Sequence, residues 1–392
     1  MSDSLHLVDT TMFWSPTGGG VRRYLQTKHD WLASQAGWRH SIAVPRVGEA
    51  RASTAAASLP SWPLPGSGGY RLPVDRRGIA GVLVGLVPDL IEVGDPYRTA
   101  WGALDAARAL RIPALAYCHS NVVAMARLAA GRRFAGAAAR VAERYARHVY
   151  RGFDLVLAPS RSMAAQLQDW GVARVACQPL GVDTEIFHPR ARDRSWRARH
   201  GWTDTDRLLV YAGRFAPEKH LDVVAAAVAR LGAPHVLVAI GAGPAPPPAS
   251  SRVAVLPFVA SAAELATALA SADAFVHAGD QETFGLSALE AMACGTPAVL
   301  RASEGLAELT DGDSGALGVR DGSAAAFAEA IAALFAGDVA ERSRAARRRA
   351  EASDWKSVFP GLLGHYQRLV DARAGARAPI ARERDAAAAM QR

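Results

Sequence analysis

The sequence predicts an α/β protein with two doubly wound domains, each a parallel sheet that helices cover on both faces. The length of 392 residues exceeds what one ordinary core holds and fits two domains. Short apolar runs alternate with helical segments, which is typical of parallel sheets buried on both faces. A charged stretch at 190–199 interrupts the alternation, which then begins again. We therefore expect one sheet on each side of this stretch.

The first domain is predicted over residues 1–188. A glycine-rich loop at 15–20 precedes its first helix, which is expected over 21–31. Residues 45–75 are expected to be irregular, because Ala, Ser, Pro and Gly dominate them. Buried strands are expected where short apolar runs occur, at 5–8, 41–44, 90–93, 114–117 and 154–158.

The second domain is predicted over residues 189–355, followed by a last helix over 356–374. Gly375 is a typical helix stop, and residues 375–392, rich in Arg and Ala, are expected to form a disordered tail. Such sheets bind ligands at the carboxyl ends of their strands, so two facing sheets predict a ligand in the cleft between the domains. The expected strands of this domain are at 208–211, 235–240, 253–256, 274–277 and 298–300.

Composition argues against several classes of protein. No apolar run reaches the roughly 18 residues of a membrane-spanning helix, and the N-terminus lacks a signal-peptide pattern. Cys118, Cys177 and Cys294 form no CxxC pair, so we expect a cytoplasmic protein with free thiols. The net charge of +8 fits a genome that favours arginine codons, or an anionic partner such as a diphosphate or a membrane surface. Nucleic acid is not expected, because no aromatic-basic motif accompanies the charge.

Two carboxylates, Glu282 and Glu290, flank an expected junction between a loop and a helix at Phe284-Gly285-Leu286. The first N–H groups of a helix lack internal partners and bind anions such as a diphosphate. The carboxylates can instead accept hydrogen bonds from hydroxyls. The block therefore predicts a site for a ligand that is both phosphorylated and polyhydroxylated, as a nucleotide sugar is.

Arg214 and Lys219 follow a predicted strand and could both reach one anion, although a solvated loop is the alternative. Gly19 and Gly20 precede the first helix, where backbone N–H groups can approach a phosphate, but no GKS or GKT ending indicates an NTPase. His119 ends the strand at 114–117 and is expected to face the cleft. A lone histidine at such a position is nevertheless more often structural.

Three patterns are interpreted as structural. Asp204-Thr205-Asp206 spells the DxD of metal-dependent sugar transferases but precedes a strand, at the end away from the cleft, and Asp311-Gly312-Asp313 is a glycine turn. No cluster has metal-ligand spacing, so no metal is expected. Gly241-Ala242-Gly243-Pro244 is interpreted as a tight turn, because the prolines that follow block the helix of a dinucleotide motif.

The segment 132–151 is predicted to be a helix with an apolar stripe and a basic stripe on different sides. It is either a surface helix whose apolar stripe packs in the core, or a contact with anionic lipid worth about 1 kcal/mol per basic residue. The apolar stripe comprises Phe134, Ala138, Val141, Tyr145 and Val149, and the basic stripe Arg133, Arg140, Arg144, Arg147 and Arg151.

Together these motifs resemble the retaining, nucleotide-sugar-dependent glycosyltransferases of family 4, which have the GT-B fold of two Rossmann-like domains around a cleft. The resemblance extends over almost the whole chain. One departure is Ala278-Gly279-Asp280-Gln281, where related sequences often have a Pro-Ser pair. The matching motifs are Gly18-Gly19-Gly20-Val21-Arg22-Arg23-Tyr24, Tyr117-Cys118-His119-Ser120, Ala158-Pro159-Ser160, Pro179-Leu180-Gly181-Val182-Asp183, Phe187-His188-Pro189, Gly213-Arg214 with Glu218-Lys219, and the block from Glu282 to Pro297.

The resemblance implies four catalytic residues, His119, Arg214, Lys219 and Glu282. Arg214 and Lys219 would contact the donor diphosphate and offset the charge that develops on it. Glu282 and His119 would lie beside the donor sugar, and Glu290 would hold the ribose. The implied donor-binding backbone groups are those of Gly19, Gly20, Phe284, Gly285 and Leu286.

The implied reaction transfers a hexosyl unit with retention, with mannose from GDP-mannose as the favoured donor. The acceptor would be a hydroxyl of a lipid-linked or polysaccharide-type molecule, and neither a metal nor a cofactor is expected. The last helix would cross back to the first domain, and the enzyme could contact the inner face of the cytoplasmic membrane. The alternatives are a GT-B sugar-nucleotide epimerase, a phosphorylase, or a non-catalytic sugar-nucleotide-binding protein.

Overall fold

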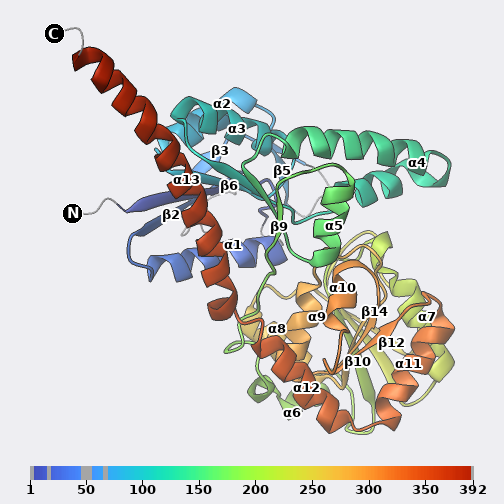
Figure 1. The fold of residues 1–392 in the computed structure, drawn as a ribbon. Helices are drawn as coiled ribbons and strands as arrows, with labels where there is room; N and C mark the ends of the chain where they lie inside the picture. Colours follow the sequence, from blue (N-terminus) through green and yellow to red (C-terminus); the bar gives the residue numbers. More distant parts are fainter. Residues whose placement is uncertain (1–3, 16–18, 46–54, 65–68, 390–392) are drawn as a thin grey trace.

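The computed structural model describes residues 4–15, 19–45, 55–64 and 69–389, and in this part of the chain it contains two parallel sheets (Figure 1). The strand order is β3-β2-β1-β6-β7-β8-β9 in the first sheet and β12-β11-β10-β13-β14-β15 in the second. In each sheet the strand that comes first in the sequence, β1 or β10, lies inside the sheet, and later strands are added first on one side of it and then on the other. This reversal is typical of a doubly wound sheet. The predicted fold class is confirmed.

The first sheet contains all five strands that were expected in it. The region expected to be irregular also contributes β3, which pairs with β2 at the edge of the sheet. Its Ala-rich sequence has low β propensity, so pattern reasoning missed it. The strands are β1 (Leu5–Thr10), β2 (Trp38–Pro45), β3 (Ala55–Leu59), β6 (Leu90–Val93), β7 (Ala114–Tyr117), β8 (Leu155–Ala158) and β9 (Val175–Cys177), with β4 (Trp62–Pro63) and β5 (Arg71–Leu72) as a separate antiparallel pair. The helices are α1 (Gly20–Ala33), α2 (Arg76–Gly85), α3 (Arg98–Leu110), α4 (Val122–Tyr150) and α5 (Arg161–Asp169).

The second sheet also contains its five expected strands, together with β15. One apolar core lies between this sheet and α7 with α11, and another lies on the opposite face under α8 and α9. The strands are β10 (Arg207–Ala212), β11 (His235–Ile240), β12 (Val253–Leu256), β13 (Ala274–His277), β14 (Ala298–Arg301) and β15 (Ala316–Val319). The helices are η1 (Pro189–Ala191), α6 (Arg194–Arg199), η2 (Pro217–Lys219), α7 (Leu221–Leu231), α8 (Ala262–Ser271), α9 (Leu286–Ala293), α10 (Glu304–Leu309), α11 (Ala324–Ala336) and α12 (Val339–Glu351).

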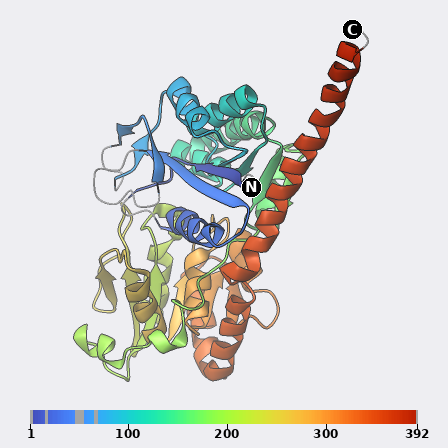
Figure 2. The same cartoon turned by 90° about the vertical axis from the view of Figure 1, so that its left-hand side faces the viewer.

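The last helix, α13 (Trp355–Ala389), leaves the second domain and runs along the first (Figures 1 and 2). Phe359 and Tyr366 are buried there, with ring centroids 5.2 Å from Trp31 and 6.0 Å from Trp38 respectively. The helix continues past Gly375 to Ala389, so the expected end at residue 374 is wrong, while the expected disorder of the segment after it stays a prediction. One glycine costs only about 1 kcal/mol in a helix interior, so Gly375 does not by itself end the helix.

Helix α4 is kinked at Gly131 and presents a different face to the core from the one predicted. Phe134 and Val141 are 60% and 65% exposed, whereas Ala139, Ala146 and Val149 are buried. The predicted apolar stripe is therefore wrong for Phe134 and Val141, whereas Val149 faces the core as predicted. A stripe of alanines faces the core instead, because small side chains let the helix pack closely.

Candidate functional site

The carboxyl ends of strands from both sheets come together where the two domains meet. The side-chain Oγ1 of Thr283, just before α9, donates a hydrogen bond of 3.1 Å to the main-chain oxygen of His119, just after β7. Helix α1 lies on the side of the first domain that faces the second (Figures 1 and 2). A Cβ atom at Gly20, the first residue of α1, would lie 3.1 Å from Leu286 Cδ2 in α9. The predicted residues of the two domains therefore share one interface.

Glu282 is held by two side chains of the second domain. Lys219 Nζ donates to Glu282 Oε1 at 2.5 Å, and His277 Nε2 lies 3.0 Å from the same oxygen. Because His277 Nδ1 accepts a hydrogen bond from the Gly279 N–H, its Nε2 carries the proton that is donated to Glu282. Burial opposes the charge of Glu282, but the ammonium of Lys219 and the hydrogen bond from His277 together outweigh it and hold the pKa of the carboxyl well below its usual range. The carboxylate is ionised and fixed in place.

His277 was missed by the sequence reasoning. It ends β13, at the same kind of position that singled out His119 at the end of β7. The rule that placed one histidine in the cleft could therefore have found the other.

Arg214 and Lys219 have different partners in this structure. Arg214 Nη2 lies 2.7 Å from Glu218 Oε1, and its side chain is 64% exposed. Lys219 contacts Glu282 and is 13% exposed. Both side chains leave the loop after β10, so the shared loop is as predicted, while a common anion for the two remains a prediction.

The two glutamates of the block have opposite electrostatic environments. Glu290 lies in α9 and is 2% exposed, and burial raises the pKa of its carboxyl. Its Oε1 lies 3.2 Å from Arg23 Nη1, and its buried Oε2 has no hydrogen-bond partner among the described residues. An unpaired buried oxygen is costly, and a ligand hydroxyl would satisfy it.

The start of α9 is built as predicted. Gly285 is the residue before the helix and has a φ of +95°, a conformation that glycine adopts without strain. A Cβ at Gly285 would lie 2.5 Å from Leu306 Cδ2, so packing also requires glycine. Phe284 is 8% exposed and covers the core beneath the turn.

The imidazole of His119 is fixed between aromatic rings. It stacks on Tyr117 with a centroid distance of 4.4 Å and an interplanar angle of 7°, and Tyr24 lies 5.2 Å away. Burial, assisted by the positive charge of Lys28, lowers the pKa of His119 to about 3. The ring is therefore neutral at neutral pH, and it can exchange hydrogen bonds with hydroxyls without carrying charge.

The chain is similar to known proteins along both of its domains. The family model "Glycosyltransferase Family 4" matches residues 18–186, and "Glycosyl transferases group 1" matches residues 206–337. A GDP-mannose-dependent alpha-(1-6)-phosphatidylinositol dimannoside mannosyltransferase of Mycobacterium tuberculosis is 32% identical over 380 residues, covering 92% of this chain and 95% of that protein. The chain belongs to glycosyltransferase family 4.

Other relatives of this glycosyltransferase agree with that assignment. A GDP-mannose-dependent alpha-mannosyltransferase of Mycolicibacterium smegmatis is 34% identical over 320 residues, 80% of this chain and 83% of that protein. Sucrose-phosphate synthase from Thermosynechococcus elongatus superposes with a TM-score of 0.77 at 20% identity, covering 94% of this chain and 100% of that one. Anabaena HepE in complex with UDP-glucose superposes with a TM-score of 0.71 at 17% identity, covering 93% of this chain and 99% of that one. The fold is GT-B.

Arg23 is a second residue of the glycosyltransferase that sequence reasoning missed. It lies in α1, one residue before Tyr24, and crosses the interface to reach Glu290. The glycine-loop motif contained it, but no pattern in the sequence pairs two residues of opposite charge in different domains. The loop residue Gly18 lies outside the described residues, while Gly19 precedes α1 with open space around it.

The motifs interpreted as structural have structural surroundings. A Cβ at Gly241 would lie 1.9 Å from the Gly213 carbonyl oxygen, and one at Gly243 would lie 2.1 Å from that of Phe215. Both glycines therefore serve close backbone packing. Asp206 accepts hydrogen bonds from the N–H and hydroxyl of Thr203 at the amino end of β10. Within the described ranges, no three His, Cys, Asp or Glu side chains gather as a metal site.

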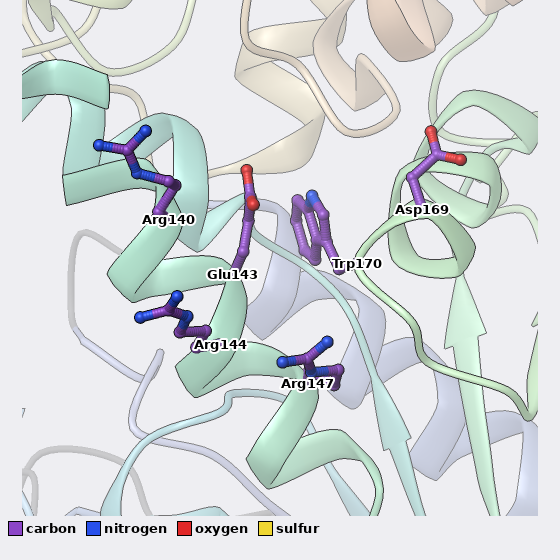
Figure 3. Close-up of a pocket in the computed structure, with 6 residues that line it drawn as sticks. All are labelled: Arg140, Glu143, Arg144, Arg147, Asp169 and Trp170. Atoms are coloured by element: carbon purple, nitrogen blue, oxygen red, sulfur yellow. The ribbon is translucent and has the colours of Figure 1, made fainter. Parts of the chain in front are cut away.

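A pocket of about 340 Å³ lies away from this interface, between α4 and α5 (Figure 3). In Figure 3, Arg140, Arg144 and Arg147 project from α4, and Glu143 lies between Arg140 and the indole of Trp170. Its lining comprises Arg140, Glu143, Arg144, Arg147, Asp169 and Trp170. The predicted basic stripe is therefore exposed, and part of it forms a pocket.

Proposed function

We propose that this glycosyltransferase moves a mannosyl unit from GDP-mannose, with retention of configuration, to a hydroxyl of a lipid-linked or polysaccharide-type acceptor. The donor is supported by the names of relatives that are 32% and 34% identical, both GDP-mannose-dependent mannosyltransferases. The observation that supports the site best is the Glu282 carboxylate. Lys219 and His277 fix it at the domain interface, with His119 entering from the other side.

The proposed chemistry follows from the charges of these side chains. The bond between the anomeric carbon and the diphosphate oxygen breaks, and Lys219 and Arg214 stabilise the charge left on the diphosphate. The acceptor hydroxyl oxygen attacks the anomeric carbon from the same face, and its proton passes to the leaving phosphate oxygen. Glu282 and neutral His119 hold hydroxyls of the sugar. The unpaired Oε2 of Glu290 accepts a hydrogen bond from the ribose.

We propose that the reaction needs no metal, because two cations of the chain are available for the diphosphate. The positive charges of Lys219 and Arg214 would stabilise the negative charge that develops on the diphosphate. Transfer should therefore be unchanged in EDTA. Loss of activity in EDTA and its recovery with Mn²⁺ would contradict this proposal and return attention to Asp204 and Asp206.

The donor can be identified by ligand-induced stabilisation. Binding adds RT ln(1 + [L]/Kd) to the free energy of unfolding and so raises the melting temperature. GDP should therefore stabilise the enzyme more than UDP or ADP at equal concentration. Turnover should then be measurable as the release of GDP from GDP-mannose in the presence of an acceptor. A larger shift with UDP, and turnover of UDP-glucose, would replace the mannosyl assignment by a glucosyl one.

We further propose peripheral contact with an anionic membrane through α4. No helix in the described ranges is long and apolar enough to cross a bilayer. The exposed Phe134 and Val141 would enter the membrane surface. Arg140, Arg144 and Arg147 would bind anionic head groups, each contributing about 1 kcal/mol to the binding free energy. Sedimentation with anionic liposomes should weaken strongly when the three arginines become glutamate. Unchanged sedimentation would contradict the contact.

A further inference from the structure

Glu304 has a backbone conformation that side chains other than glycine rarely adopt. It is the first residue of α10, three residues after Arg301 at the carboxyl end of β14, and its φ is +48°. The following Gly305 leaves no alternative, because its N–H donates to the Glu282 carbonyl at 2.8 Å and a Cβ there would lie 2.5 Å from the Thr283 carbonyl oxygen. Such a strained residue at a site is a reason to look for a function of its side chain.

The Glu304 carboxylate reaches across to the first domain. Asn121 Nδ2 and Gln166 Nε2 each lie 3.3 Å from Glu304 Oε1. The orientation of both amides is set by other hydrogen bonds. Asn121 Oδ1 accepts from the Ala124 N–H at the start of α4, and Asn121 Nδ2 also donates to Gln166 Oε1 at 2.8 Å. Two N–H donors of the first domain therefore aim at one oxygen of Glu304.

The other oxygen, Glu304 Oε2, is buried and has no hydrogen-bond partner among the described residues. Burial raises the pKa of Glu304, and the negative charges of Asp280 and Glu282 add to the effect. Glu304 therefore lies close to the carboxylate that faces the donor sugar, and Asn121 lies two residues after His119. A carboxylate oxygen that receives no hydrogen bond from the protein can accept one from a ligand hydroxyl, the hydrogen-bonding group that sugars supply.

We propose that Glu304 binds a hydroxyl of the acceptor and so sets which acceptor is used. The residues assigned to the diphosphate and the ribose of the donor belong to the second domain, whereas the Glu304 carboxylate accepts hydrogen bonds from two amides of the first domain. Its unpartnered oxygen is thus buried where the two domains meet, and there the proposed acceptor would supply a hydroxyl. This role rests on the proposed transfer reaction, and it assigns Glu304 to the acceptor rather than to the leaving nucleotide.

The test compares Glu304→Gln and Glu304→Gly with the wild type. Transfer is followed with the nucleotide sugar that the wild type turns over, to methyl α-D-mannopyranoside and to phosphatidylinositol dimannoside in detergent micelles. Both variants should lose roughly tenfold or more in kcat/KM for the acceptor through a higher KM, since a group that binds a substrate hydroxyl is removed. The Kd for GDP should change by less than about twofold. Glu304→Gly should melt no lower than the wild type, because glycine adopts this φ without strain.

Glu308→Gln is the matched control. Glu308 lies in the same helix and also contacts the first domain, where it accepts from the Ser162 N–H at 3.0 Å and pairs with Arg161 at 3.6 Å. Its acceptor KM should stay near the wild-type value. An equal rise in Glu308→Gln would show that joining the domains is the cause and would overturn the proposal, as would an unchanged acceptor KM or a loss of GDP affinity in Glu304→Gln. No transfer by the wild type would overturn the proposed function together with this role.

Discussion

At the scale of single residues, the two cations of the β10 loop differ in what they stabilise. Lys219 is mostly buried and holds Glu282, so it belongs both to the fold and to the site. Arg214 is exposed and pairs with Glu218, and such exposed pairs contribute about 0–1 kcal/mol. The contributions of the two residues to catalysis and to stability can therefore be separated.

Arg214→Ala should lower kcat at least about 100-fold, the effect of removing one charge-stabilising group, with less than about 1 kcal/mol lost in stability. Lys219→Ala should lower kcat similarly and also cost about 1–3 kcal/mol, because it leaves Glu282 without its main partner. Initial rates and melting temperatures of both variants test this. Near-normal turnover in either variant would show that its side chain does not stabilise the leaving diphosphate.

The low pKa of His119 has a defined effect on stability. The unfolded chain takes up a proton on this histidine below about pH 6.5, while the native ring stays neutral until about pH 3. Its contribution is therefore complete above pH 6.5 and is lost as the pH falls towards 3, by at most about 1.4 kcal/mol per pH unit. The difference in melting temperature between wild type and His119→Gln should shrink from pH 7 to pH 4. A constant difference would place the native pKa near 6.5.

Site residues that belong to local motifs could be predicted from the sequence, whereas pairs of residues from different domains could not. Glu282, Glu290 and His119 follow from strand ends and a helix start, which are local features. Arg23 and Glu304 act on residues of the other domain, and a single sequence contains no signal for such contacts. The conformation of Glu304 is likewise imposed by Gly305 packing on the glutamate block, which is tertiary information.

At the scale of elements, strands were predicted better than the faces of helices. Continuous apolar runs identify buried parallel strands directly. For α4, the predicted face was misplaced, because the large residues Phe134 and Val141 were expected inside. The helix packs through Ala139 and Ala146 and exposes Phe134 and Val141. Helix spacing alone does not distinguish a close-packed alanine stripe from a larger apolar stripe beside it.

This packing predicts opposite sensitivities on one helix. Ala146→Leu should destabilise the protein by about 1–3 kcal/mol, since the site has no room for extra methylene groups. Val141→Ala should stay within about 0.5 kcal/mol of the wild type because the side chain is exposed. Thermal melting followed by circular dichroism compares them. A larger loss in Val141→Ala would mean that the predicted face is the core face after all.

At the scale of the whole molecule, the last helix is joined to the centre of the first domain. Lys28 is buried and donates to Asp9, to Glu92 at 2.8 Å and to the Tyr366 hydroxyl at 3.1 Å. The Tyr366 hydroxyl in turn donates to Glu92. Burial raises the pKa of Glu92 to about 7 despite the charge of Lys28. The stability of this buried cluster therefore depends on the hydrogen bonds among its side chains.

Tyr366→Phe should therefore lower stability by about 1–3 kcal/mol, the cost of leaving buried polar groups unpaired. Tyr145→Phe is the control, because Tyr145 is 38% exposed and water can replace the hydrogen bond that it donates to Pro96. Melting temperatures of the two variants should differ clearly. Equal melting temperatures would show that the Tyr366 hydroxyl adds nothing to the attachment of α13.

The attachment of α13 also bears on how the protein is made. Lys28 and Tyr366 are separated by 338 positions in the chain. A ribosome that has completed the first sheet has not yet synthesised the tyrosine that closes its buried polar cluster, nor Phe359, which covers Trp31. The first domain therefore emerges with an unfinished core. Its folding ends only when the second domain has been translated and the final helix returns, so the first domain to begin folding is also the last to finish.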